Sequence, residues 1–109
     1  MSGTYRVDYS RDGADDLLNI KGYVEQVFGS PRTARRQVNA IRETVRRLEA
    51  MPARHPIIEE GAMERRRVRR LNVGSFAIFY VVDEEGHRVS IVRIVGGRRD
   101  LRGIVGYER

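Results

Sequence analysis

The sequence predicts an α+β domain in which an antiparallel sheet packs against a helical hairpin. Three observations predict this class. An alternating strand pattern opens the chain, two stretches with helical spacing follow it, and three strand-like stretches separated by short turns come last. The expected order is therefore β-α-α-β-β-β, with the hairpin on one face of the sheet. A length of 109 residues suits one domain, over residues 1–109, and is too short for two.

The first strand is expected at residues 4–10, where Tyr5, Val7 and Tyr9 alternate with polar residues. A first helix is expected from Asp12, because acidic residues favour the positive end of the helix dipole, and Gly29 is expected to end it. The apolar residues of this stretch recur at helical spacing: Ala14, Leu17, Leu18, Val24, Val27 and Phe28. One side of this helix should therefore face the core.

The second helix is expected to begin at Ser30-Pro31, a capping residue followed by a proline that fits the first turn. It should end near Met51-Pro52, since a proline disfavours helical geometry in the residue before it. Its apolar stripe is Ala34, Val38, Ile41, Val45 and Leu48. Residues 52–63 show no periodicity and are expected to form a loop.

Three strands are expected in the last third of the chain, at residues 66–73, 76–82 and 88–95. Short turns separate them, so they should form an antiparallel meander. The stretch 76–82 is apolar at nearly every position, which places it in the middle of the sheet. A short C-terminal helix is expected at residues 100–105.

Composition excludes several kinds of site. The chain has no cysteine, so it has no disulfide, no zinc–thiolate site and no cysteine nucleophile. His55 and His87 have no partner at metal-ligand spacing, and we expect no metal and no small-molecule cofactor. No stretch has the length or apolar character of a membrane span or a signal peptide, so we expect a cytoplasmic protein that does not contact membranes.

The formal net charge of +6 comes entirely from the C-terminal part of the chain. Residues 1–64 carry ten basic and ten acidic side chains, whereas residues 65–109 carry eleven basic and five acidic ones. Lys21 is the single lysine, and a guanidinium binds phosphate or carboxylate oxygens through a planar fork of donors. The natural partner is a polyanion, either nucleic acid or an acidic protein. The alternative is a genomic preference for arginine combined with a solvated surface.

The strand expected at 66–73 would direct Arg67 and Arg69 to one face of the sheet and Arg66 and Arg70 to the other. In the last strand Arg93 falls among apolar residues that would share its face. It could contact a polyanion, or it could form an ion pair with a neighbour in the sheet.

The chain resembles the RelE/ParE superfamily of toxins from bacterial type II toxin–antitoxin modules over nearly its whole length. The order and spacing of several short motifs carry the resemblance. These are Tyr5 to Ser10, Ala14 to Leu17, Ile20 with Tyr23 and Val24, Leu48 with Pro52, Arg70 to Phe76, Phe79 to Asp83, and Ile91 to Asp100 with its Gly-Arg-Arg-Asp ending.

The resemblance implies a sheet packed on a helical hairpin and an acidic antitoxin wrapped around the toxin. It also implies one of two targets. RelE-like members cut messenger RNA in the ribosome, and they are enzymes; ParE-like members inhibit DNA gyrase and have no nuclease activity. We expect a ribosome-dependent endoribonuclease, by a narrow margin because the arginine excess lies on the strands and tail, and a gyrase inhibitor is the alternative. A plain nucleic-acid-binding module lacks support, because no stacking aromatics accompany the basic residues.

The resemblance also implies site residues. Arg70, Arg98 and Arg99 match basic catalytic positions, where cations would stabilise a crowded phosphorane. Tyr107 is a possible equivalent of the RelE aromatic. Further nucleic-acid contacts are expected from Arg65, Arg66, Arg67, Arg69, Arg93 and Arg102.

The chain departs from the superfamily pattern at three positions. Ala77 stands where both branches commonly have arginine, and Gly96 where many members have histidine. The RelE aromatic would fall near Ile104, three residues before Tyr107.

Overall fold

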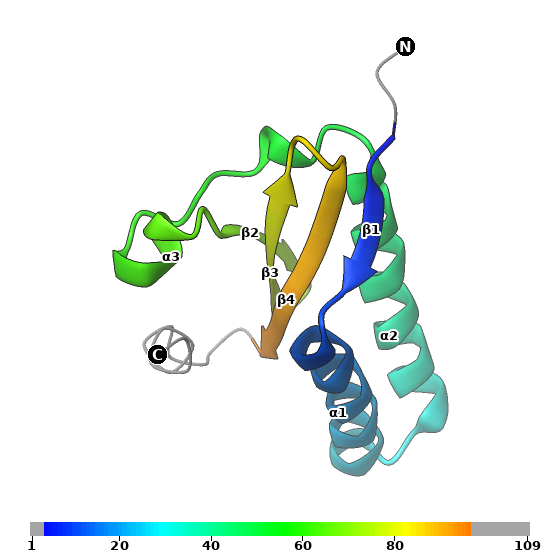
Figure 1. The fold of residues 1–109 in the computed structure, drawn as a ribbon. Helices are drawn as coiled ribbons and strands as arrows, with labels where there is room; N and C mark the ends of the chain where they lie inside the picture. Colours follow the sequence, from blue (N-terminus) through cyan, green and yellow to red (C-terminus); the bar gives the residue numbers. More distant parts are fainter. Residues whose placement is uncertain (1–3, 97–109) are drawn as a thin grey trace.

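A four-stranded sheet forms the centre of the structure, a computed structural model that describes residues 4–96 apart from the side chain of Phe28 (Figure 1). The strands are β1 (Arg6–Tyr9), β2 (Arg69–Val73), β3 (Phe76–Asp83) and β4 (Arg88–Gly96). Their order across the sheet is β1-β4-β3-β2. The predicted element order and the central position of the third strand are confirmed. The C-terminal helix expected at residues 100–105 lies outside the described residues.

The sheet is mixed, and the prediction of an antiparallel sheet is correct only for three of its strands. Strands β2, β3 and β4 form the predicted meander, whereas β1 pairs in parallel with β4, placing Arg6 opposite Arg88 and Tyr9 opposite Ile91. Alternation along a strand reports which residues face the core, but it does not report which strand lies alongside. The parallel pairing was therefore not visible in the local pattern.

Two helices form the hairpin that follows β1. Helix α1 (Arg11–Phe28) begins one residue earlier than predicted, because the hydroxyl of Ser10 accepts a hydrogen bond from the backbone N–H of Gly13 at 3.0 Å. It ends at Gly29, which adopts the left-handed conformation with φ 62°. Helix α2 (Pro31–Arg46) has the predicted cap, since the Ser30 hydroxyl accepts from the N–H of Thr33 at 3.2 Å.

Helix α2 ends at Arg46 and not near Met51-Pro52 as predicted, and two short 3₁₀ turns follow it, η1 (Arg47–Glu49) and η2 (Pro52–Arg54). Met51 separates them with a φ of 50°, so the chain turns sharply where the proline was expected to stop the helix. The buried hydroxyl of Tyr80 donates to the carbonyl of Pro52 at 2.6 Å. This bond holds the turn against the end of the sheet.

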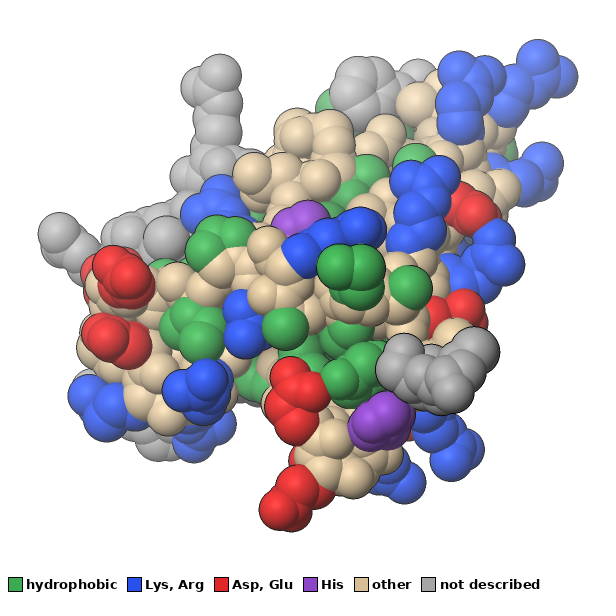
Figure 2. Space-filling view, turned by 90° about the horizontal axis from the view of Figure 1, so that it is seen from above, with side chains coloured by type: hydrophobic (Ala, Val, Ile, Leu, Met, Phe, Trp, Pro, Cys, Tyr) green, Lys and Arg blue, Asp and Glu red, His purple; other side chains and the backbone are tan. Residues whose placement is uncertain are grey.

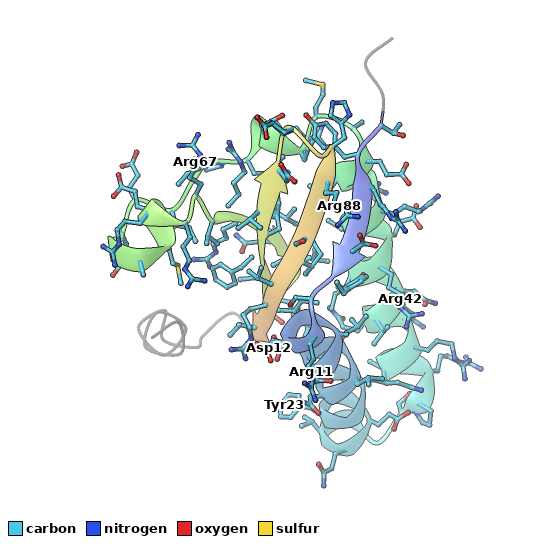
Figure 3. The ribbon with its side chains drawn as sticks, viewed as in Figure 1. Arg11, Asp12, Tyr23, Arg42, Arg67 and Arg88 are labelled. Carbon is cyan, nitrogen blue, oxygen red and sulfur yellow. The ribbon has the colours of Figure 1, made fainter. Side chains whose placement is uncertain are left out.

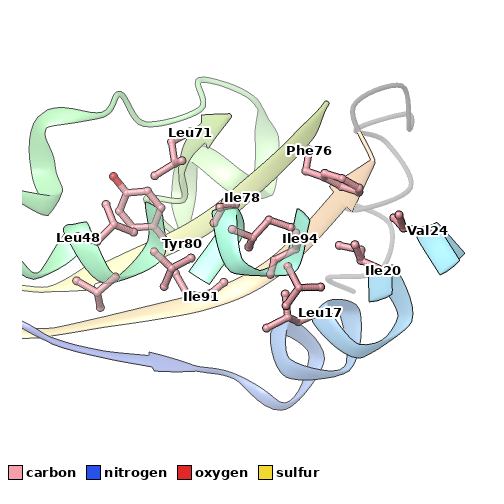
Figure 4. Packing of buried hydrophobic residues seen from close by; sticks show 14 of the residues in the cluster. Leu17, Ile20, Val24, Leu48, Leu71, Phe76, Ile78, Tyr80, Ile91 and Ile94 are labelled. Carbon is pink, nitrogen blue, oxygen red and sulfur yellow. The ribbon is translucent and has the colours of Figure 1, made fainter. Parts of the chain in front are cut away.

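The main core lies between the hairpin and the sheet (Figure 4). The predicted stripe of α2 is buried in full. Helix α1 contributes Leu17, Ile20 and Val24, whereas Leu18 and Val27, expected on the apolar face, are exposed. The sheet completes this core with these residues: Leu71, Phe76, Ile78, Tyr80, Val89, Ile91 and Ile94.

The opposite face of the sheet carries a second, smaller core. Met63 and Val68 pack there against Ala77, Phe79 and Val95. The short helix α3 (Gly61–Arg65) forms within and just beyond the stretch predicted to be a loop, and β2 accordingly begins at Arg69 instead of residue 66. The hairpin is on one face as predicted, but the other face is partly covered as well.

No helix in residues 4–96 is long and apolar enough to cross a membrane.

Candidate functional site

The arginines of residues 65–67 lie on a helix end and a turn, not on a strand. Arg65 is the last residue of α3, Arg66 caps that helix, and Arg67 has a φ of 59°. All three are exposed. The prediction that Arg67 shares a sheet face with Arg69, and Arg66 with Arg70, is therefore wrong, because the alternation of a strand begins only after Val68.

Arg70 lies on the sheet face that carries the second core. It pairs with Phe79 across β2 and β3, and its guanidinium carbon lies 5.7 Å from the centre of the Phe79 ring. Its Nε donates to Oδ1 of Asn72 at 3.3 Å. Among the described residues no carboxylate forms an ion pair with Arg70, so its charge is oriented but not neutralised.

Arg69 points the other way and has a structural role. One terminal nitrogen donates to the carbonyl of Ala53 at 3.0 Å and to that of His55 at 2.6 Å. These bonds attach the η2 turn to β2. Burial, together with the nearby Arg54 and Arg69 charges, lowers the pKa of His55 and so favours its neutral form.

Arg93 forms an ion pair with helix α1. Its Nε lies 2.7 Å and a terminal nitrogen 3.2 Å from the two carboxylate oxygens of Asp16, and Asp16 also accepts from the backbone N–H of Ile94 at 2.9 Å. The side chains of Arg93 and Asp16 are 22% and 14% exposed. Of the two alternatives for Arg93 an ion pair is the one observed, but its partner is in a helix and not in the sheet.

An irregularity in the sheet explains this position of Arg93. The register of β3 and β4 shifts between Phe79, which pairs with Arg93, and Tyr80, which pairs with Ile91. Val92 therefore has no partner residue in β3 and forms a β-bulge in β4. Before the bulge, Val89 and Ile91 face the main core, and beyond it Ile94 takes over that direction. Arg93, which strict alternation would place on the same face as Val89 and Ile91, is therefore displaced from it.

A groove of about 810 Å³ lies beside this ion pair, between α1 and the ends of β3 and β4. Tyr23 lines it and is 62% exposed (Figure 3). The other lining residues are Asp16, Asn19, Ile20, Ser75, Phe76, Arg93, Ile94, Val95 and Gly96. The groove thus combines an apolar floor with one charged pair.

The structure does not gather the predicted site residues into one constellation within residues 4–96. Arg70 lies on the edge strand β2, and β3 separates it from Arg93 on β4. The position of Ala77 is buried in the second core. Four predicted residues lie outside the described residues: Arg98, Arg99, Arg102 and Tyr107. Within residues 4–96 no group of His, Asp and Glu side chains could hold a metal ion.

The structure also shows a set of cations to which the sequence analysis gave no role. The outward side of α2 and the start of η1 carry six exposed arginines, the α2 arginine face: Arg32, Arg35, Arg36, Arg42, Arg46 and Arg47. The even balance of charges over residues 1–64 concealed this set, because most of the compensating carboxylates lie on other elements. Their spacing along the predicted helix was the signal that could have found them.

Comparisons with known proteins agree with the fold. A family model described as the ParE toxin of the type II toxin–antitoxin system parDE matches residues 7–101. A search of curated protein sequences finds no significant match.

Three solved structures share the fold. The chromosomal ParDE toxin–antitoxin system from P. aeruginosa has a TM-score of 0.71 and 24% identity, with 87% of this chain and 98% of that chain covered. The toxin–antitoxin complex RelBE2 from Mycobacterium tuberculosis has a TM-score of 0.63 and 18% identity, covering 88% and 94%. The isolated E. coli RelE toxin has a TM-score of 0.54 and 11% identity, covering 96% and 97%.

Proposed function

Because the chain belongs to the ParE toxin family of type II toxin–antitoxin systems, we propose that it arrests growth by binding DNA gyrase and not by cutting messenger RNA. This reverses the narrow expectation from the sequence. The observation that carries the proposal is the ion pair between Arg93 and Asp16, which commits a predicted RNA-contacting cation to the fold.

Cleavage of RNA by cations requires several of them to converge on one phosphate, where they stabilise the charge that develops on the phosphorane. Arg93 is neutralised by Asp16. Arg69 points to the sheet face opposite that of Arg70 and donates hydrogen bonds to backbone carbonyls. At position 77, where both branches commonly have arginine, this chain has an alanine that is buried in the second core. Inhibition by binding to a protein needs no such convergence, so these losses are compatible with a gyrase inhibitor.

The exposed cations near α3 support the alternative of an endoribonuclease. Arg65, Arg66, Arg67 and Arg70 lie close together in the chain, and Arg70 has no carboxylate paired with it among the described residues. This surface would have to act together with Arg98 and Arg99. We therefore include both activities in the test.

The test is an induction experiment that scores transcript integrity and DNA supercoiling together. We expect transcripts on translating ribosomes to stay intact, and we expect the purified chain to inhibit supercoiling by gyrase. The decisive variant changes Arg70, Arg98 and Arg99 to alanine together. The matched control changes Arg11 and Lys21, two exposed residues of α1, to alanine.

Transcripts cut within codons, with the cuts lost in the triple variant and kept in the control, would establish the endoribonuclease and refute the gyrase proposal. Normal growth with intact transcripts and normal supercoiling would contradict both.

We also propose that an acidic antitoxin covers the groove beside Asp16 and Arg93. The groove exposes Tyr23 above an apolar floor, which suits a segment of another protein. The neighbouring reading frame should encode a short acidic protein that co-purifies with this chain. Tyr23→Asp should release it, whereas Leu18→Asp, at an exposed α1 residue that does not line the groove, should not.

A further inference from the structure

The α2 arginine face has an arrangement fixed by a regular helix. Arg35, Arg42 and Arg46 follow one another at intervals of seven and four residues, so they lie along one line on the helix surface. Arg32 and Arg36 lie beside this line. From Arg32 to Arg46 the helix extends about 21 Å, because each residue adds about 1.5 Å. The backbone positions of these five arginines are thus held at set distances along a rigid rod.

The charge of this face is barely compensated. Glu43 is the single acidic residue of α2, and its ion pair with Arg46 is the only one that these arginines form among the described residues. Figure 2 shows Lys and Arg side chains on several sides of the molecule, most of them on the right of the view, where some acidic side chains lie among them. Figure 3 places Arg42 on the outer side of α2, away from Arg67 near α3. The face is therefore separate from the cations at residues 65–70.

The composition of the face indicates the class of its partner. Protein interfaces are usually anchored by aromatic or arginine side chains that become buried among apolar neighbours, but the exposed residues of α2 offer arginines with only Pro31 and Ala40 as apolar neighbours on that surface. Single-stranded nucleic acids are bound largely by stacking of bases on aromatic rings, and α2 contains no aromatic residue. A duplex, in contrast, offers a rigid array of about one phosphate charge per 1.7 Å along its axis.

We infer that the α2 arginine face binds the phosphate backbone of duplex nucleic acid without reading its sequence. Arginine forks suit phosphate oxygens, and a row of them along about 21 Å of one helix can contact several phosphates of a regular duplex at once. Asn39 lies between Arg35 and Arg42 on the same line and adds a neutral donor for a phosphate. This inference goes beyond the proposed function, because it concerns free duplex and requires no gyrase.

The test measures binding of the purified full chain to a labelled duplex of about 20 base pairs by fluorescence anisotropy at several salt concentrations. The test variant carries Arg35→Gln and Arg42→Gln. The matched control carries Arg11→Gln and Lys21→Gln on α1, which removes the same charge from exposed positions. Glutamine is a good helix former, and circular dichroism should confirm that both variants are folded.

We expect the test variant to bind about tenfold more weakly, with the slope of log affinity against log salt reduced by about 2, the number of phosphate contacts removed. The control should lose less than about threefold. Equal losses in the two variants would show that net charge alone drives binding, and would overturn the inference. Tighter binding to the single strand of the same sequence would also overturn the inference. The same holds if polyglutamate competes for the chain as strongly as unlabelled duplex does.

These outcomes are independent of the gyrase proposal. A chain that fails to inhibit gyrase but binds duplex through α2 refutes the proposed function alone. A chain that inhibits gyrase but binds duplex equally well without Arg35 and Arg42 refutes the α2 inference alone.

Discussion

Asp16 connects helix α1 to strand β4 through one carboxylate. It accepts two hydrogen bonds from the guanidinium of Arg93 and one from the backbone N–H of Ile94, and it lies in the second turn of α1. The helix is thereby attached to β4 just beyond the bulge. The same pair forms one wall of the groove next to Tyr23.

Replacing Asp16 should destabilise the fold. Asp16→Ala leaves Arg93 and the Ile94 N–H without their partner, and we expect the free energy of unfolding to fall by about 3 kcal/mol. This is the lower end of the range for breaking a buried ion pair, because both side chains keep some solvent contact. Asp16→Asn should lose about 2 kcal/mol. Urea denaturation measures both.

Asp15→Asn is the control for this prediction, since Asp15 is exposed and lies at a similar distance from the helix N-terminus. We expect it to change stability by less than about 0.5 kcal/mol. A similar loss in Asp15→Asn and Asp16→Asn would assign the effect to the helix dipole and not to the pair with Arg93.

Tyr80 gives the stability of the fold a specific dependence on alkaline pH. Burial raises the pKa of Tyr80 from 10.0 to about 12, against the smaller opposing effects of Arg69 and Arg54. The folded chain therefore holds the phenol proton more tightly than the unfolded chain does. The stabilisation is complete below pH 10 and is lost as the pH rises toward 12; a rise of about two pKa units is equivalent to at most about 3 kcal/mol in total.

Tyr80→Phe should remove most of this alkaline decline and should cost about 1 kcal/mol at neutral pH, because the carbonyl of Pro52 loses its donor. Urea denaturation at a series of pH values measures both effects. Tyr23→Phe changes an exposed tyrosine and should keep the decline. An unchanged decline in Tyr80→Phe would show that another group causes it.

At the scale of elements, the sequence predicted those features of the helices that depend on residues close together in the chain. The Ser30 cap, the stop at Gly29 and the buried stripe of α2 depend on local geometry, and all three are confirmed. Helix α3 was missed because its five residues are too few to show a helical period, and it is held by Met63 in the second core. The parallel pairing of β1 and the bulge in β4 depend on contacts distant in sequence, which no local pattern records.

The candidate site was predicted less well for the same reason. The role proposed for Arg70 stays a prediction. For Arg93 the sequence raised an ion pair as one possibility, but it could not name the partner Asp16, which is 77 residues away. Strand alternation misplaced Arg66 and Arg67 because the start of β2 was set three residues too early. Charge counting over long stretches concealed the α2 arginine face.

Two glycines of the helical hairpin should respond oppositely to alanine. Gly22 lies inside α1 with no atom within 4 Å of an added Cβ, so Gly22→Ala should stabilise the chain by about 0.5–1 kcal/mol through helix propensity. Gly29 has equal space but a φ of 62°, so Gly29→Ala should destabilise it by about 1 kcal/mol. Thermal unfolding of the two variants is the measurement. Effects of the same sign would contradict this account of the α1 end.

At the scale of the whole molecule, residues 4–96 contain two concentrations of positive charge, the α2 arginine face and residues 65–70, and Figure 3 shows Arg42 of the first and Arg67 of the second on different sides of the sheet. The net charge is +6, and repulsion within each group opposes folding. Partners that carry negative charge can therefore approach from more than one side.

Added salt should stabilise the isolated chain. Screening weakens the repulsion, so we expect the melting temperature to rise by a few degrees between low salt and about 0.2 M sodium chloride. The variant with Arg35→Gln and Arg42→Gln should show a smaller rise. A melting temperature that falls with salt would mean that attractive ion pairs outweigh the repulsion.

The parallel pairing of β1 with β4 has a consequence for synthesis of the chain. The earliest strand to leave the ribosome has its only neighbour in the last strand described, more than eighty residues later. The hairpin can form early from local contacts, but the sheet it covers stays incomplete until β4 has emerged. A nascent chain interrupted before β4 therefore cannot acquire the finished fold, and truncated products of this kind add no folded toxin to the cell.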